Sequence, residues 1–205
     1  MILVALVLAA APPVPPVSGR MFPLGGRLEL TPSLGISLGD AFFQKASVGG
    51  RAAWHLGDEW AIGVHAAKTL SRVAAPLAVC ADSLECSAPE ATRLSQAPGD
   101  LFALASAEVE WSPLYGKLSL LAEAIVHFDV HVSLGPAVAM YRIGDQLQLG
   151  AGGRATLGER VYLGPRTALN LELSELVYRA EIRGSPAWEP QAFFSLGMTW
   201  LFGGR

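Results

Sequence analysis

The sequence predicts an all-β protein, an antiparallel transmembrane β-barrel of about eight strands with a long external loop and a periplasmic excursion. Three observations lead to this prediction. Hydrophobic residues make up 51% of the 205 residues and charged residues only 16%, well under the roughly 25% of ordinary soluble domains. Apolar and polar side chains alternate with a period of two over many segments. After the N-terminus, no apolar run approaches the roughly 20 residues that a membrane-spanning helix needs.

Segments of about ten alternating residues, separated by turn residues, are the sequence signature of a transmembrane barrel. In the first segment Leu28, Leu30 and Leu34 share one face, and the residues between them are polar or small. The full set of segments is 28–38, 45–55, 60–67, 101–111, 129–140, 146–155, 169–174 and 194–202. Aromatic residues end several apolar faces, as in interfacial girdles: Trp54, Trp60, Trp111 and Phe202. A soluble lipocalin-like barrel is the alternative, but its outer face would carry many more Lys and Glu residues.

The polar faces predict what fills the barrel. An interior ringed by eight strands has room only for side chains, which argues against a diffusion pore. The charges on these faces are of both signs, and we expect them to pair in a small polar lumen: Arg51, Glu108, Glu110, Arg154 and Glu172.

The N-terminal residues 1–19 resemble a signal peptide, and residues 20–205 form the barrel domain. Ile2 to Ala11 is a continuous apolar run of ten residues followed by prolines, too short to span a bilayer. Cleavage after Ala10, or near Ser18 and Gly19, fits the small residues there. A buried N-terminal strand is the alternative.

An even strand number with both ends in the periplasm assigns each turn to one side of the membrane. The turns at 39–43, 71–100, 143–145 and 179–189 then face outward. Gly57–Asp58 and Gly158–Glu159 become short periplasmic turns. Lys117 to Phe128 would make a ninth strand, so we interpret it as a periplasmic excursion, partly helical, between the fourth and fifth strands.

Several phrases of the sequence resemble the myxobacterial-type outer-membrane β-barrel domain family, which is distantly like the small OmpA/OmpX barrels. These phrases are residues 26–32, 35–43, 49–51, 111–118 and 127–129, and the resemblance covers roughly residues 21–202. It implies an outer-membrane location. For some relatives it also implies a role in envelope assemblies, including gliding-motility machinery.

Composition and motifs exclude several classes of function. The net charge of −3 and the pI near 5.8 argue against a nucleic-acid partner. Gly35 to Gly39 matches the hydrolase pattern G-x-S-x-G around Ser37, but no helix follows to complete such a site. Gly150 to Gly153 lacks the ending of a phosphate loop, so these glycines are expected to permit tight packing in the wall. We therefore predict no catalytic residues and no cofactor.

His127, Asp129 and His131 are weak candidates for a metal or acid–base site. An extended segment places the two imidazoles and the carboxylate on one face, a combination that can bind zinc. A hydrogen-bonded cluster in the lumen is the simpler expectation, because no fourth ligand is identifiable.

Cys80 and Cys86 lie in the longest predicted loop, and we expect them to form a disulfide in an oxidising envelope. Only two cysteines are present, so a disulfide-rich scaffold and a four-cysteine zinc site are excluded. A metal or redox pair is the alternative.

Together these features predict a non-enzymatic barrel with a structural or adaptor role in the cell envelope. Its expected partners are outer-membrane lipid and envelope proteins, contacted through the 71–100 loop or the 117–128 segment. Two alternatives remain: an outer-membrane enzyme acting on lipid or peptide through His127, Asp129 and His131, and a soluble periplasmic carrier.

Overall fold

The computed structural model describes residues 20–39, 43–73, 79–82, 85–87, 100–120, 124–143, 146–182 and 185–203. The predicted signal peptide, residues 1–19, lies outside these ranges. Within them no helix has the length and apolar character needed to cross a bilayer.

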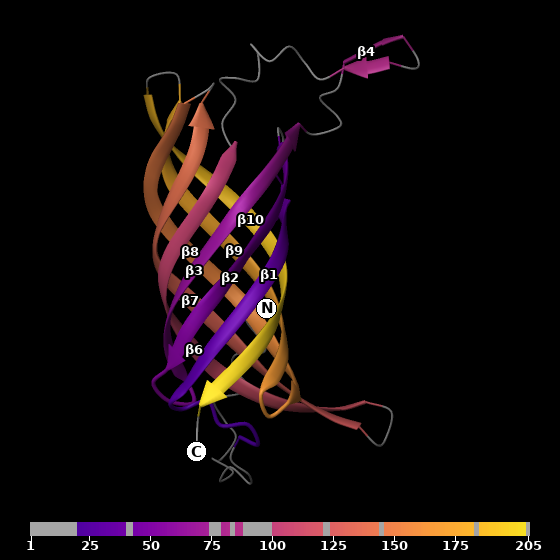
Figure 1. The fold of residues 1–205 in the computed structure, drawn as a ribbon, viewed down its shortest axis with the longest axis vertical. Coiled ribbons are helices and arrows are strands. Elements are labelled where there is room, and N and C mark those ends of the chain that lie inside the picture. Colours follow the sequence, from indigo (N-terminus) through magenta and orange to yellow (C-terminus); the bar gives the residue numbers. More distant parts are fainter. Residues whose placement is uncertain are drawn as a thin grey trace, which may run out of the picture.

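Eight long strands close into a single barrel, which confirms the predicted fold class (Figure 1). Each strand pairs antiparallel with its neighbours in the order β1-β10-β9-β8-β7-β6-β3-β2, and β2 closes back on β1. The strands are β1 (Arg27–Leu38), β2 (Phe43–His55), β3 (Trp60–Val73), β6 (Leu101–Leu120), β7 (Ala124–Ile143), β8 (Gln146–Gly164), β9 (Thr167–Ile182) and β10 (Ser185–Gly203).

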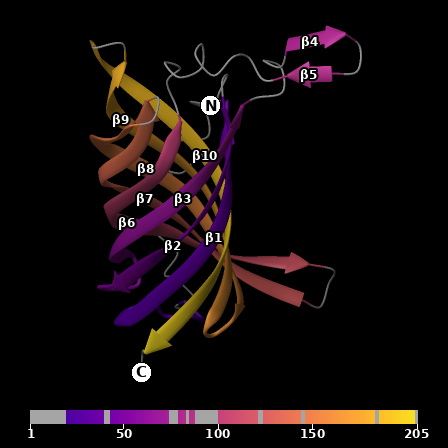
Figure 2. The same ribbon diagram turned by 45° about the horizontal axis from the view of Figure 1, so that its top comes forward.

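Two short strands, β4 (Val79–Asp82) and β5 (Glu85–Ser87), pair with each other outside the barrel wall (Figure 2). They lie at the end of the barrel where β3 finishes and β6 begins. The C-terminal end of β10 lies at the opposite end, as does the short β2–β3 turn. Because periplasmic turns are short and extracellular loops long, the β4–β5 end faces outside.

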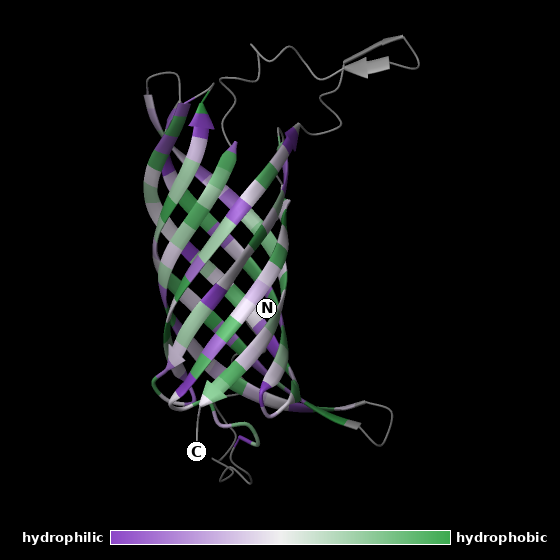
Figure 3. Cartoon of the chain, in the orientation of Figure 1, coloured by the Kyte–Doolittle hydropathy of each residue, from purple (hydrophilic) through white to green (hydrophobic). Residues whose placement is uncertain are grey.

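The outer face of the barrel is apolar and the inner face polar. Large side chains on the outside are extensively exposed, among them Leu34 (66%), Leu134 (66%) and Leu149 (68%). Figure 3 shows the underlying alternation of hydropathy along each strand. An apolar band of this extent around a barrel is soluble only in lipid. The soluble-carrier alternative is therefore wrong, since it requires the reverse arrangement.

The predicted periplasmic turn at Gly158–Glu159 is wrong, because β8 continues to Gly164. Gly158 stands opposite His131 in the β7–β8 register, and a Cβ atom there would collide with the imidazole ring. This glycine makes room for a lumenal side chain. The alternation continues beyond it, and Arg160 and Tyr162 also face inward.

The 117–128 segment does lie at the periplasmic end, but its described residues, 117–120 and 124–128, are strand and not helix. β6 and β7 run past the barrel rim as one two-stranded extension, in which Leu114 to Leu120 pair with Val130 to Ala124. Figure 2 shows this extension projecting from the side of the barrel. Gly116 opposes Phe128, whose ring covers the glycine backbone. The extra chain length is thus absorbed by lengthening two strands, and no ninth strand is needed.

Two predicted outer turns are shorter than expected. β9 runs to Ile182 and β10 begins at Ser185, with Trp188 paired to Arg179, so most of the 179–189 segment is strand. Within the 71–100 segment, β3 extends to Val73 and the β4–β5 pair is formed. The rest of that segment, 74–78, 83–84 and 88–99, lies outside the described residues.

Candidate functional site

The lumen is the only region where charged side chains from most strands converge within the described chain. Its buried charged residues comprise the carboxylates Glu29, Glu108, Glu110, Asp129 and Glu172 and the guanidinium groups Arg51, Arg154 and Arg160, with Lys45 near the outer end. The charge pairing predicted for Arg51, Glu108, Glu110, Arg154 and Glu172 is confirmed. Buried charges are tolerated only when they are paired and hydrogen-bonded, so the members of this cluster depend on one another as a single network.

Arg160 on β8 is the centre of the network. Its side chain is fully buried and lies 3.1 Å from Glu29 on β1, 3.0 Å from Glu110 on β6 and 3.2 Å from Asp129 on β7. One guanidinium thus joins four strands, and its planar fork of donors suits several carboxylates at once. Tyr162 donates a hydrogen bond to Asp129 from the next inward position of β8.

Arg51 and Arg154 extend the network along the barrel. Arg51 pairs with Glu110 and lies 3.4 Å from Glu29. Arg154 donates a 2.6 Å hydrogen bond to Glu108 and lies 3.6 Å from Glu172.

Hydroxyl and imidazole groups complete the coordination of the carboxylates. Ser106 and Ser133 donate to the two oxygens of Glu108 at 2.5 and 2.7 Å, and His55 lies 2.9 Å from Glu29. The carboxylates are thereby fixed in place, and the network resembles a polar core more than a channel lining.

His127, Asp129 and His131 line the lumen as expected, but each has different partners. His127 is hydrogen-bonded to the Tyr115 hydroxyl at 2.7 Å, and Asp129 is held by Arg160. His131 lies 3.8 Å from both Asp129 and Glu172. Among the described residues no three His, Cys, Asp or Glu side chains are grouped to hold a metal ion.

The outer half of the lumen is filled by an apolar layer. Its buried members are Leu101, Leu104, Ala137, Ala139, Tyr141, Leu176, Tyr178, Ala180 and Phe193. Gly150 lies against the Tyr141 and Tyr178 rings, where a Cβ atom would be too close to Tyr178. The expectation that glycines 150–153 permit close packing is confirmed at Gly150 and Gly152, each of which faces the β9 backbone.

The periplasmic end is closed by a smaller apolar layer of Leu24, Tyr162, Ala168 and Leu201, packed with Phe22 and Tyr115. The chain before β1 folds into this end, and Asp58 accepts hydrogen bonds from the Leu24 and Gly25 amides at 2.8 and 3.0 Å. Between the layers, a space beside Arg51, His65 and Glu172 does not accommodate a sphere the size of a water molecule. The middle of the lumen is therefore filled by side chains at this level, between the two apolar layers.

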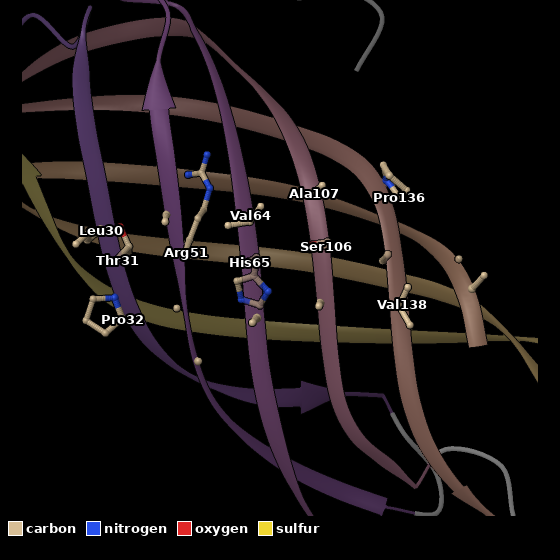
Figure 4. A pocket seen from close by; sticks show the side chains of 18 residues that line it. Leu30, Thr31, Pro32, Arg51, Val64, His65, Ser106, Ala107, Pro136 and Val138 are labelled. Carbon is tan, nitrogen blue, oxygen red and sulfur yellow. The ribbon is translucent and has the colours of Figure 1, made fainter. Parts of the chain in front are cut away.

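A groove of about 880 Å³ is lined by residues of β1, β2, β3, β6, β7 and β8 (Figure 4). Its lining includes the lipid-facing Leu30, Val64 and Val138 beside lumen-facing neighbours such as His65. The register places small outward-facing residues directly opposite one another on neighbouring strands here. For example, Gly50 is opposite Ala66, and Ala66 is opposite Ala105. Since this lining is mostly apolar and within the belt, acyl chains cover it in a bilayer.

Sequence reasoning missed some members of the network. Glu29 lies on the polar face of the predicted 28–38 strand, but the sequence does not identify it as a charge partner. Arg160 and Tyr162 follow the turn that was wrongly predicted at Gly158–Glu159, so they were not assigned to a strand. Their signal was present, because Arg154, Arg160 and Tyr162 share the same parity. Ser37 is a partly buried side chain that accepts a hydrogen bond from the Lys45 amide at 2.9 Å. Cys80 and Cys86 stand directly opposite each other in the β4–β5 pairing. Their disulfide stays a prediction, because their side chains lie outside the described part.

No family model matches the chain, and no curated protein matches it. Among solved structures, the N-terminal β-barrel domain of Pseudomonas aeruginosa OprF aligns with a TM-score of 0.48 and 10% identity, over 87% of this chain and 98% of that one. P. aeruginosa OprG gives a TM-score of 0.47 and 12% identity over 88% and 97% of the two chains. Neisserial surface protein A gives 0.44 and 12% over 86% and 96%.

With TM-scores below 0.5, these likenesses transfer no ligand or role to this chain. The closed ring of an even number of antiparallel strands, the apolar belt and the polar interior are the features of this class of membrane protein. The protein is an outer-membrane β-barrel. Its resemblance to the myxobacterial-type family in particular stays a prediction.

Proposed function

We propose that this outer-membrane barrel is a non-enzymatic, non-conducting structural or adaptor element of the cell envelope. The filled lumen supports the proposal above all. A charge network with three arginines at its centre lies between an outer apolar layer and a periplasmic apolar layer. Solute passage would require breaking buried ion pairs, each costly to separate.

The placement of the acidic and imidazole side chains favours this proposal over an enzyme acting on lipid or peptide. His127 is 7% exposed, His131 is 1% exposed and Asp129 is fully buried. A general acid or base must come within hydrogen-bond reach of its substrate, and these groups are enclosed by protein.

The adaptor role rests on the parts of the chain that leave the barrel. The β6–β7 extension carries exposed apolar side chains beyond the periplasmic rim, with Leu114 60%, Leu118 52% and Ile125 65% exposed. The described β3–β6 pairing ends at Trp60 opposite Trp111, followed by one hydrogen bond of 2.7 Å from the Ser112 amide to the Glu59 carbonyl. A strand that continues past the end of its ladder is a common docking surface for an extended segment of another protein. The 71–100 segment is the corresponding candidate outside.

The finer assignment, a place in a gliding-motility or surface assembly, rests on the resemblance to the myxobacterial-type family. An envelope machine that spans the periplasm needs anchors of this kind in the outer membrane. The β6–β7 extension is then the segment that faces such a partner.

Planar-bilayer recording of the purified full-length chain tests closure. We expect no conductance steps above those of protein-free bilayers, with a general porin as the positive control. Reproducible steps whose frequency rises with the amount of reconstituted protein would contradict the proposal. Before each recording, unboiled gel migration is used to show that the barrel and the control porin are each folded.

A further inference from the structure

The outer end of the barrel has an interrupted seam between β3 and β6. Their register runs from Trp60 opposite Trp111 to Lys68 opposite Ala103, whereas β3 continues to Val73. Beyond the ladder, two side-chain hydroxyls take over: Thr69 donates to the Leu101 carbonyl, and Ser71 donates to the same oxygen at 3.3 Å. The wall is thus held by side chains at this place, and backbone pairing is lost.

A cleft of about 900 Å³ lies over this seam. Three exposed cationic side chains line it, Lys68, Arg72 and Arg142, against the single carboxylate of Asp100. The buried Lys45 borders it from the lumen side, where its ammonium donates a hydrogen bond to Gln191. Its remaining walls include apolar side chains such as Ile36 and Leu70, which are 55% and 63% exposed on the lipid side. The cleft is therefore cationic and apolar at once, in a chain whose net charge is negative.

Phe102 organises the cations on the outer surface. The Lys68 ammonium lies 5.3 Å from the centre of this ring, and the Arg142 guanidinium lies 5.7 Å from it. Arg142 is also 3.9 Å from Asp100, but the guanidinium side chain is 44% exposed, and such a long exposed pair neutralises little charge. Two cations thus share one aromatic ring while their charges stay available to a ligand.

The depth of the cleft matches the outer boundary of the bilayer. Lys68 is eight strand positions beyond the girdle residue Trp60, which at ~3.3 Å per residue and ~40° of tilt is about 20 Å along the barrel axis. Arg72 is four positions further on. Since the apolar band of such barrels is about 25 Å tall, the Lys68 backbone lies about 5 Å inside its outer edge, and Arg72 lies about 5 Å beyond that edge. Long cationic side chains at this level extend toward the polar headgroups.

We propose that this cleft binds a lipid of the outer leaflet whose headgroup carries a phosphate and a net negative charge. The phosphate would be held between Lys68, Arg142 and Arg72, and an acyl chain would lie against Leu70 and Ile36. Charge complementarity selects an anion, and the apolar wall beside the cations selects an amphiphile over a free ion. The inference does not depend on the β6–β7 extension, which lies at the opposite end of the barrel.

The test is competition for the intact chain in detergent, read by native mass spectrometry with phosphatidic acid and phosphatidylcholine as probes. We expect the wild type to retain phosphatidic acid preferentially. Near a membrane each cation contributes about 1 kcal/mol, or roughly fivefold in affinity, so the double variant Lys68→Gln/Arg142→Gln should bind it roughly 25-fold more weakly. The charge-preserving double variant Lys68→Arg/Arg142→Lys should bind as the wild type does.

Arg179→Gln is the matched control, because Arg179 is exposed on β9, outside the cleft lining. It should leave phosphatidic acid binding unchanged. Equal losses in Arg179→Gln and the double variant would show non-specific attraction and overturn the proposal. Inorganic phosphate that competes as strongly as phosphatidic acid would overturn the lipid assignment. All variants are first shown to be folded by their unboiled gel migration.

Discussion

Arg160 shows how a single buried side chain fixes the closure of the barrel. Its guanidinium touches carboxylates on β1, β6 and β7, so it links the first strand to strands on the other side of the lumen. No solvent reaches it, and its charge is balanced entirely by protein. Removal of one partner from such a network leaves uncompensated buried charge.

We therefore expect Arg160→Met to destabilise the folded barrel by about 3–5 kcal/mol, the usual range for breaking a buried pair. Urea titration in detergent, followed by gel migration, measures the change as a lower midpoint. Arg166→Met is the control, because Arg166 is exposed in the β8–β9 turn. Equal midpoints for the two variants would show that the Arg160 network contributes no more than a surface charge.

At the scale of elements, the β6–β7 extension is the feature with the clearest functional prediction. A photo-crosslinking residue in place of Leu118 should join the protein to an envelope protein in intact cells, because this side chain is 52% exposed beyond the rim. The same residue in place of Leu134 should give lipid adducts only, since Leu134 is 66% exposed within the belt. Lipid adducts alone from both positions would contradict the adaptor role of the extension.

The extension should also be dispensable for folding. Lys117 and His127 are directly paired, so residues 118–126 can be replaced by Asn-Gly, a sequence suited to a two-residue turn. The charge network lies entirely inside the barrel, so we expect the free energy of unfolding, measured by urea titration, to stay within about 0.5 kcal/mol of the wild type. A large loss of stability would show that the extension supports the barrel wall.

At the scale of the whole molecule, the barrel should behave as one closed unit. Every strand of the ring is hydrogen-bonded to a neighbour on both sides. The ring therefore has no edge strand from which unfolding could start. The unboiled protein from an outer-membrane fraction should therefore migrate differently from the boiled protein on a detergent gel. A soluble protein without a migration difference would overturn the membrane assignment.

The sequence by itself determined the architecture, because strands with one apolar face and one polar face can span a bilayer only as a closed barrel. Leu28 to Leu38 and Phe194 to Phe202 were assigned to the correct faces from parity alone, and the two strands are neighbours in the ring. The charges of both signs on the inner face also predicted that charge pairs form in the lumen, and the Arg154–Glu108 pair is one of them.

Only the tertiary structure decided where strands end and which charges meet. Gly158 carries a local turn signal, yet it accommodates His131 from the neighbouring strand, a contact that no local pattern contains. The same is true of Arg160, whose partners are separated from it by 31 to 131 positions in the chain and meet it only when the ring closes. The open β3–β6 seam likewise arises because β3 outruns its partner, a difference in length that pairing alone reveals. Local alternation sets which way a side chain faces; register and closure set what it touches.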